Sequence, residues 1–259
     1  MAVHPTALVD PGARIAESAE IGPFCVIGPE VEIGPGTRLI AHVYVEGPTG
    51  IGEDNLFYPY SSIGVASQDL KYKGERAETF IGSRNRIREF VTIHRGTQGG
   101  GLVTRIGDDN LLMAYVHVAH DCAVGNHVIL VNGVTLGGHV TIEDWVEISA
   151  YTGVHQFCRV GRHAIVGGYS VVTQDVMPFS STVSDRPIRV FGANKIGLER
   201  RGFTRETIEA LQTAMRLLTR AQLNTTQAVE RIRAEVPAGP EIEELLAFIG
   251  SSQRGVIKG

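Results

Sequence analysis

Large apolar side chains recur at every sixth position of this 259-residue chain, and this period constrains the fold more than any other feature. The first run holds eleven in succession, from Val3 to Ile63, and its register resumes from Ile81 to Ile93. A second run, one residue out of phase, extends from Ile106 to Val172. A small side chain nearly always stands four positions after each of them. Such a period fits neither a 3.6-residue helix nor a two-residue strand alternation.

A period of six fits a coil with short flat sides, in which the large apolar residue points inward. Three sides make an 18-residue coil, and stacked coils pair as parallel strands about 4.8 Å apart. Glycine is abundant, at 31 residues, and aromatic residues are only 7% of the chain. We expect Gly22, Gly28 and Gly34 to supply turn conformations that a Cβ would oppose. The pattern resembles the hexapeptide-repeat family, whose fold is a left-handed parallel β-helix, over residues 3 to about 177; the handedness comes from the resemblance alone.

Two insertions interrupt the coils, around Val65–Phe80 and Arg95–Arg105. The run 99–101 in the second insertion consists of glycines without the Lys-Ser/Thr of a phosphate loop, so we interpret it as flexible backbone. Beyond Pro187 the apolar period becomes helical. The residues expected on helix faces are Ile208, Leu211, Met215 and Leu218 after a Thr204 cap, then Val229 with Ile232, then Ile242, Leu245, Leu246 and Ile249. We therefore predict an all-β domain over residues 1–186 and a C-terminal α-helical domain over residues 187–259.

Charge is divided between these two parts. Lys and Arg exceed Asp and Glu by four from Arg186 onward, whereas residues 1–185 carry an acidic excess of eight. This is either a set of solvated helix faces or a site for an anionic ligand or an acidic partner. No apolar stretch approaches the roughly 18 residues of a membrane span, and the first ten residues lack signal-peptide order. We expect a cytoplasmic protein with no membrane span and no nucleic-acid partner. Three scattered cysteines indicate neither a disulfide framework nor a zinc knuckle.

The 18-residue coil places distant side chains relative to one another. His120, Gly138 and Gln156 are 18 residues apart, so they should stack in one column. His117, Asp121, His139 and His155 lie within three positions of that column. Several imidazoles therefore converge on one edge of the prism.

Two chemistries could use this column. One is a zinc site, since γ-class carbonic anhydrases carry three histidines on the same repeat fold. The other is acyl transfer, in which a neutral imidazole takes the proton of an attacking hydroxyl and a backbone N–H holds the oxyanion. Cys122, at a small inward position, is expected to be a buried, inert thiol. A non-enzymatic, carrier-binding β-helix is a third interpretation.

Five short segments carry a closer resemblance. They are Gln68–Tyr72, Thr92–Thr97, His117–Cys122, Val154–Phe157 and Arg200–Phe203. Together they resemble the UDP-N-acetylglucosamine O-acyltransferase family, the first enzymes of lipid A biosynthesis, and the resemblance runs nearly end to end. It implies that His120 is the general base on the glucosamine 3-hydroxyl, that Asp121 supports it, and that the Gly138 N–H is the oxyanion donor.

The resemblance also implies the substrate contacts and partners. Residues matching the family's sugar contacts are Asp69, Lys71, His117, His139 and Gln156, with His155 close by. Asn194, Arg200 and Arg201 match those that hold the uridine diphosphate, and arginine forks suit phosphate oxygens. The implied donor is an (R)-3-hydroxyacyl group on acyl carrier protein, an acidic partner. No cofactor and no metal are expected, and the site is expected between subunits of a homotrimer.

Gly168 matches the family position that limits acyl chain length, and a glycine there leaves the groove open. We predict that Gly168→Met shifts selectivity to shorter donors, which a chain-length profile tests. One departure is Ile196, where the family often has a carboxylate, so nucleotide contacts must differ in part. Some relatives accept a 3-amino sugar, and that acceptor stays open. Another hexapeptide acyltransferase, such as the N-acyltransferase acting later in the pathway, typically carries an additional N-terminal domain, whereas here the hexads begin at Val3.

Overall fold

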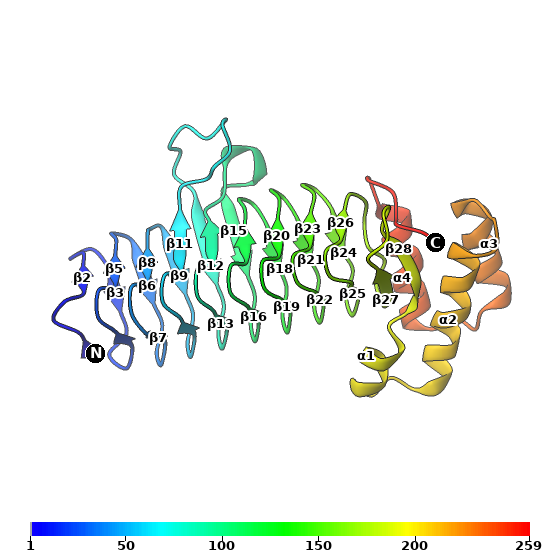
Figure 1. The fold of residues 1–259 in the computed structure, drawn as a ribbon, viewed down its shortest axis with the longest axis horizontal. Coiled ribbons are helices and arrows are strands. Elements are labelled where there is room, and N and C mark those ends of the chain that lie inside the picture. The colour runs from blue at the N-terminus through cyan, green and yellow to red at the C-terminus, as the bar shows by residue number, and fades with distance from the viewer. Residues whose placement is uncertain (1) are drawn as a thin grey trace.

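The computed structural model describes residues 2–259, in which a three-sided prism of parallel strands is followed by a small group of helices (Figure 1). Successive strands pass to the first, second and third sheets in turn, and the coils wind as a left-handed β-helix. The fold predicted from the hexads is therefore confirmed.

Each sheet is listed here in spatial order. The first sheet contains β1 (Ala2–Val3), β4 (Glu20–Ile21), β7 (Arg38–Leu39), β10 (Leu56–Phe57), β13 (Arg86–Ile87), β16 (Leu111–Leu112), β19 (Ile129–Leu130), β22 (Glu147–Ile148), β25 (Ile165–Val166), β27 (Ser180–Val183) and β28 (Arg189–Ala193). The second contains β2 (Leu8–Val9), β5 (Val26–Ile27), β8 (Tyr44–Val45), β11 (Ser62–Val65), β14 (Thr92–His94), β17 (His117–Val118), β20 (Thr135–Leu136), β23 (Gly153–Val154) and β26 (Val171–Val172). The third contains β3 (Arg14–Ile15), β6 (Val31–Ile33), β9 (Thr49–Ile51), β12 (Glu78–Ile81), β15 (Val103–Ile106), β18 (Ala123–Val124), β21 (Thr141–Ile142) and β24 (Arg159–Val160).

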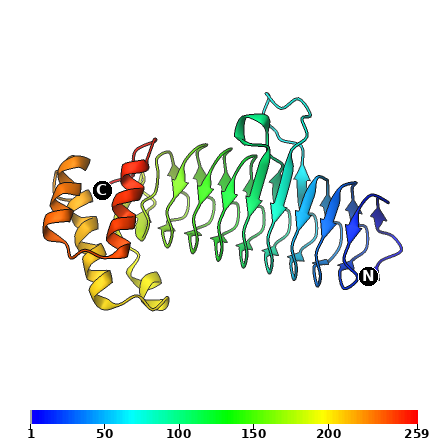
Figure 2. The same cartoon turned by 180° about the vertical axis from the view of Figure 1, so that it is seen from behind.

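The strand register shows where the coils are interrupted. In an uninterrupted coil the partner lies 18 residues on, as Thr135 pairs with Gly153. Ser62 instead pairs with Thr92, and Thr92 pairs with His117, so these two coils hold 30 and 25 residues. The extra residues form two loops that leave the same edge of the prism, after β11 and after β14 (Figure 1, Figure 2). Both predicted insertions are confirmed.

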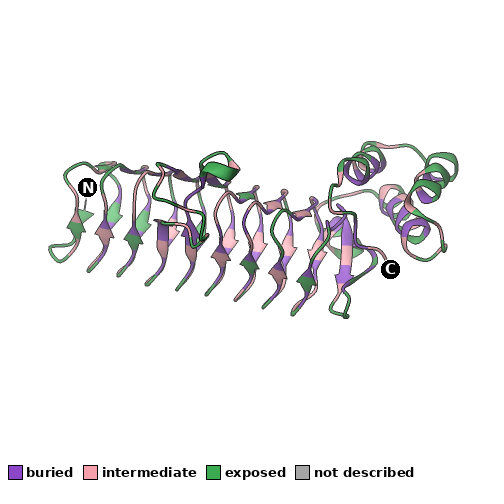
Figure 3. Cartoon of the chain, turned by 90° about the horizontal axis from the view of Figure 1, so that it is seen from above, coloured by how far each residue is buried: buried purple, intermediate pink, exposed green. Residues whose placement is uncertain are grey.

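The inward residues of the hexads form the core. Ile21 and Leu39 are 1% exposed, and the small residues four positions on, such as Cys25 and Thr37, are fully buried. Burial alternates along each strand because neighbouring side chains point to opposite faces (Figure 3). The first inward residue, Val3, is 36% exposed because no earlier coil covers it within residues 2–259.

The turn prediction for glycine was wrong. Left-handed backbone falls on the third residue after the inward apolar one, and this residue is usually not glycine, as at Phe24 (φ 57°) and Tyr60 (φ 65°). Rings at these positions stack coil on coil; Phe90 and Tyr115, for example, have centroids 4.9 Å apart. Gly22 is needed for close approach, because a Cβ there would lie 1.8 Å from the Ile40 carbonyl oxygen. Gly28 and Gly34 likewise lack positive φ.

The C-terminal part begins with β28, which pairs antiparallel with β27. The predicted boundary between residues 186 and 187 falls between these two strands, so the first sheet continues across it. Four helices follow: α1 (Lys195–Arg200), α2 (Arg205–Thr219), α3 (Thr225–Glu235) and α4 (Pro240–Ser251). The helical pattern and the Thr204 cap were predicted correctly, since Ile208 and Leu211 are buried and the Thr204 side chain accepts from the Thr207 N–H. Within residues 2–259, no helix has the length and apolarity to cross a membrane.

Candidate active site

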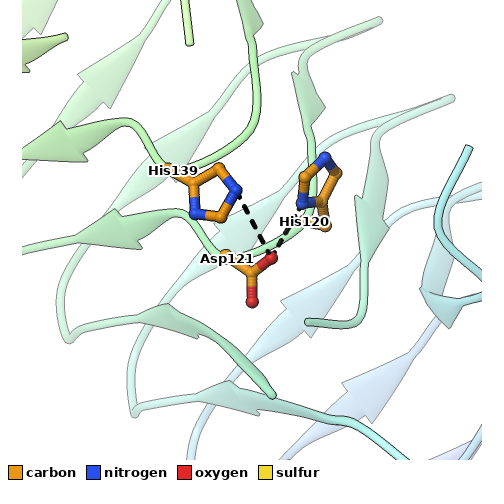
Figure 4. A group of neighbouring side chains, drawn as sticks. All are labelled: His120, Asp121 and His139. Atoms are coloured by element: carbon orange, nitrogen blue, oxygen red, sulfur yellow. Dashed lines mark hydrogen bonds and ion pairs between the residues drawn. The ribbon is translucent and has the colours of Figure 1, made fainter. Parts of the chain in front are cut away.

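Three polar side chains meet at the corner between the second and third sheets, on two successive coils. His120 and Asp121 follow β17, and His139 follows β20. Asp121 (φ 59°) and His139 (φ 61°) both have the left-handed conformation of the coil turns. The His139 N–H donates to the His120 carbonyl at 3.1 Å, which stacks one turn on the other. The two imidazoles therefore lie on either side of the Asp121 carboxylate (Figure 4).

His120 and Asp121 form a close hydrogen bond. His120 Nδ1 lies 2.8 Å from Asp121 Oδ2, and the Asp121 side chain is fully buried. Because an ionised carboxylate can only accept, Nδ1 carries the proton and Nε2 is left as the basic nitrogen of the neutral ring. Nε2 lies 3.9 Å from Oδ2 of Asp69, on the first loop. This is the geometry of an oriented general base.

Gly138 packs directly against the imidazole of His120. A Cβ at residue 138 would lie 2.6 Å from His120 Nε2, so only glycine fits beside the ring. Within residues 2–259, the structure assigns the Gly138 N–H no hydrogen-bond partner. An unpaired N–H beside a basic nitrogen is the arrangement that an oxyanion donor needs.

The two loops and the prism edge enclose an open cleft of about 970 Å³. Asp69, Lys71 and His139 line it together, and the His139 ring stacks on Phe157 with centroids 4.3 Å apart. The loops contact each other, since the Gln98 N–H donates to Glu75 Oε1 at 3.1 Å. Three of the predicted sugar contacts thus lie around one cleft.

The glycine run of the second loop has a defined structure, contrary to the prediction of flexible backbone. Residues Gln98–Gly100 form a 3-10 turn, and Gly101 has a φ of 91°. A Cβ at Gly100 would lie 2.0 Å from Asp121 Cγ. This glycine is required because its backbone covers the buried carboxylate.

His117 is paired with a histidine that the sequence did not single out. His117 Nδ1 lies 2.7 Å from Thr92 Oγ1, and its ring meets the edge of His94 with centroids 4.7 Å apart. His94 is 3% exposed, and burial, followed by the charges of His117 and His120, lowers its pKa to about 4. Burial also lowers the pKa of His117 and of His139. These imidazoles are therefore neutral at pH 7. The long second coil hides the His94–His117 spacing from a search at multiples of 18.

The remaining prism residues are more open. Gln156 and His155 are exposed on the coil after Gly138, and His155 Nδ1 lies 3.2 Å from the Gln156 carbonyl. Gly168 lies at the corner between the first and second sheets, where a Cβ would stand 3.2 Å from the Ala150 carbonyl oxygen. Gly168 is thus on a different corner from His120.

The predicted nucleotide residues form a separate group at the end of the prism. Asn194 caps α1, accepting from the Gly197 N–H at 3.2 Å, and donates to the His163 carbonyl at 2.9 Å. The Arg201 guanidinium lies 5.4 Å from the centroid of Trp145 and approaches His163 Nδ1 at 3.4 Å. Arg200 is exposed.

These residues do not meet His120 within one chain. Helix α1 lies on the opposite side of the molecule from the two loops, beyond the last coils (Figure 1). Ile196, which replaces the family's usual carboxylate, is 63% exposed on α1.

Cys122 is not a nucleophile. Burial raises the pKa of its thiol to about 12, and Sγ lies 3.1 Å from the Gly137 carbonyl oxygen. The prediction of an inert thiol is confirmed, and all three cysteines are buried and unpaired.

A metal ion could in principle use the same three side chains. One ligand atom each from His120, Asp121 and His139 lies within 4.8 Å of the others. However, Asp121 Oδ1 and Oδ2 already accept from the Thr97 N–H and hydroxyl, at 2.9 and 2.6 Å. A metal would compete with these bonds, so the contacts favour the hydrogen-bonded base over the zinc site.

Comparisons with known proteins agree over the whole chain. A family model described as "Udp N-acetylglucosamine O-acyltransferase; Domain 2" matches residues 175–257, and one described as "Bacterial transferase hexapeptide (six repeats)" matches residues 104–138. The acyl-[acyl-carrier-protein]–UDP-N-acetylglucosamine O-acyltransferase of Burkholderia lata is 47% identical over 99% of both chains. The solved UDP-N-acetylglucosamine O-acyltransferase of Moraxella catarrhalis is 43% identical over 100% of both chains, with a TM-score of 0.95. That of Francisella novicida is 40% identical over 99% of this chain and 94% of its own, also at 0.95.

Proposed function

The chain belongs to the UDP-N-acetylglucosamine O-acyltransferase family, and on this basis we propose that it moves an acyl chain from acyl carrier protein to UDP-N-acetylglucosamine, the first step of lipid A biosynthesis. The observation that carries the proposal is the dyad of His120 and the buried Asp121, set beside the unpaired N–H of Gly138. The donor is an (R)-3-hydroxyacyl thioester, and the acceptor is the glucosamine 3-hydroxyl. A nucleotide sugar is a small polar ligand that fits the open cleft lined by Asp69 and Lys71.

The reaction uses the neutral His120 ring. Nε2 takes the proton of the sugar hydroxyl while its oxygen forms a bond to the thioester carbonyl carbon. The carbonyl oxygen becomes an oxyanion, and the Gly138 N–H stabilises it. Collapse of this intermediate breaks the carbon–sulfur bond, and the His120 imidazolium returns its proton to the leaving thiol. Asp121 keeps Nδ1 protonated throughout, which leaves Nε2 free to accept.

A complete site requires a second subunit in this proposal. His120 and Asp121 lie beside the loops, whereas Asn194, Arg200 and Arg201 lie around α1, and a sugar nucleotide joins a pyranose to a diphosphate. The separation of the two groups within one chain supports a homotrimer in which neighbouring subunits share each site. The helical part carries the basic excess, which suits both the diphosphate and an acidic acyl carrier protein. The cytoplasmic location stays a prediction.

The direct test is turnover with UDP-N-acetylglucosamine and a series of 3-hydroxyacyl carrier proteins. We expect His120→Ala to keep the fold and lose at least about 10²-fold in rate, because the general base is gone. His4→Ala, at an exposed histidine, is the matched control and should leave the rate unchanged. Substantial remaining activity in His120→Ala would remove the assigned role. A parallel assay with the 3-amino sugar decides between ester and amide formation.

A chelator separates this proposal from the zinc interpretation. Acyl transfer by the His120–Asp121 pair needs no metal, so dialysis against a chelator should leave the rate unchanged. Loss of activity on dialysis, with recovery on adding Zn²⁺, would support the metal site instead.

A further inference from the structure

Thr97 contacts both oxygens of the Asp121 carboxylate. Its N–H donates to Oδ1 at 2.9 Å, and its hydroxyl donates to Oδ2 at 2.6 Å. Oδ2 is also the oxygen that accepts from His120 Nδ1 at 2.8 Å. Thr97 is 5% exposed and the Asp121 side chain is fully buried, so water does not replace these donors. Two contacts on two different oxygens fix the plane of the carboxylate as well as its position.

The second loop is built around this contact. The Thr97 carbonyl accepts from the N–H groups of Gly100 and Leu102, at 3.1 and 3.0 Å, which closes the loop into a tight turn. The turn lies on Asp121, where only a glycine at residue 100 fits. At the other end of the loop, Thr104 Oγ1 accepts from the Asp121 backbone N–H at 2.8 Å. The loop therefore holds Asp121 by its backbone and by both carboxylate oxygens.

We propose that Thr97 is a positioning residue for the acyl transfer, acting through Asp121 to keep His120 in the tautomer with Nε2 free. This inference rests on the proposed function and deepens it. Without the Thr97 hydroxyl, the carboxylate loses a charge-assisted bond on the oxygen that orients the base. The carboxylate can then turn, and the imidazole loses the partner that selects its protonated nitrogen.

The test compares Thr97→Val, which keeps the shape and removes the hydroxyl, with Thr97→Ser, which keeps the hydroxyl. We expect Thr97→Val to lower kcat by about 10- to 100-fold, the loss typical of a hydrogen bond to a charged group, while KM for the sugar nucleotide stays within about twofold. Thr97→Ser should stay close to wild type. Thr79→Val is the control, because Thr79 is equally buried and its hydroxyl has no partner within residues 2–259.

A spectroscopic readout keeps the proposal testable whatever the stability of Thr97→Val. In ¹⁵N-histidine NMR spectra, wild type and Thr97→Ser should both show His120 protonated on Nδ1, and Thr97→Val should show a mixture of tautomers. The proposal is overturned if wild-type His120 carries its proton on Nε2, if kcat is unchanged in Thr97→Val, or if Thr97→Ser loses as much as Thr97→Val. Wild-type turnover tests the function separately: an inactive wild type contradicts the proposed reaction, whereas an active one with an indifferent Thr97 contradicts only this role.

Discussion

Asp121 shows how single residues determine the chemistry of the corner. A buried carboxylate is costly unless donors satisfy it, and within the described residues no Lys or Arg forms an ion pair with Asp121. Thr97 and His120 supply the donors instead. The imidazole bonded to the carboxylate is thereby oriented, and it rests against Gly138. The same contacts that make burial of the charge tolerable also prepare the base.

Gly138→Ala tests this packing. The new Cβ would lie 2.5 Å from His120 Cε1, so the ring must move away from its hydrogen bond and from the adjacent N–H. We expect the rate to fall by about 10²-fold or more, the loss typical of a displaced oxyanion donor, with the fold retained. The change is measured as kcat beside circular dichroism. Gly153→Ala is the control, since its Cβ would meet nothing within 4 Å. Equal rates in wild type and Gly138→Ala would contradict the role of this contact.

Two buried histidines make stability depend on pH. Burial lowers the pKa of His94 and of His163 to about 4, and the charges of Arg201 and Arg162 also lower that of His163. Between pH 6.5 and 4 the unfolded chain binds these protons and the folded chain does not, so the free energy of unfolding falls as the pH falls. The loss is about 3 kcal/mol for each group near pH 4 and is absent above pH 7.

Denaturant unfolding at pH 7 and pH 4.5 measures this loss. We expect His163→Gln to reduce the difference between the two pH values, because one of the two groups no longer titrates. His4→Gln, at an exposed site, should not. A free energy of unfolding that is the same at both pH values would show that neither histidine is held neutral by the fold.

At the scale of the coil, buried asparagines join one turn to the next. Asn85 accepts from the Asn110 N–H at 2.9 Å and donates to Asn55 Oδ1 and to the Gly107 carbonyl, at 3.0 and 2.9 Å. All three asparagines are 2% exposed or less. The ladder ends at Asn110, whose Nδ2 has no partner within the described chain, because the following coil carries Val128 at the corresponding position.

Asn85→Leu should destabilise the prism near the two loops. It keeps the volume and leaves the Asn110 N–H and the Gly107 carbonyl without partners, at a cost of about 2 to 4 kcal/mol. The shift of the unfolding midpoint measures it. Asn132→Leu, at an exposed asparagine, is the matched control and should change stability by less than about 0.5 kcal/mol. A small effect at Asn85 would mean that the ladder adds little to stability.

The coils could be predicted from the sequence because each hexad repeats the same physical requirement. Ile21 and Val118 were placed inward correctly, and the column of His120 and Gly138 followed from the 18-residue coil. Thr97 and His94 were not assigned a role, since their partners depend on how the inserted loops fold, and loops carry no period. The conformation of Phe24 was missed because stacking between coils, rather than local preference, stabilises its positive φ.

At the scale of the whole molecule, catalytic and nucleotide-binding groups are at separate places on an elongated chain. The prism holds His120 and Asp121 beside the loops, and α1 holds the group of Asn194 and Arg201. Because each coil contacts only its neighbours along the axis, no movement within the prism brings these groups together. Packing of prisms side by side can do so, and a ring of copies then forms identical shared sites.

Mixed subunits test this arrangement. His120→Ala and Arg201→Ala should each be nearly inactive alone, because every site lacks one residue. If neighbouring subunits share each site, trimers reassembled from equal amounts of both chains recover about a quarter of the wild-type activity, since a site is intact only when each neighbour supplies its own half. Mixing His120→Ala with Asp121→Ala is the control and should recover nothing, because both residues belong to the same half. No recovery in the first mixture, despite exchange of subunits, would place the complete site within one chain.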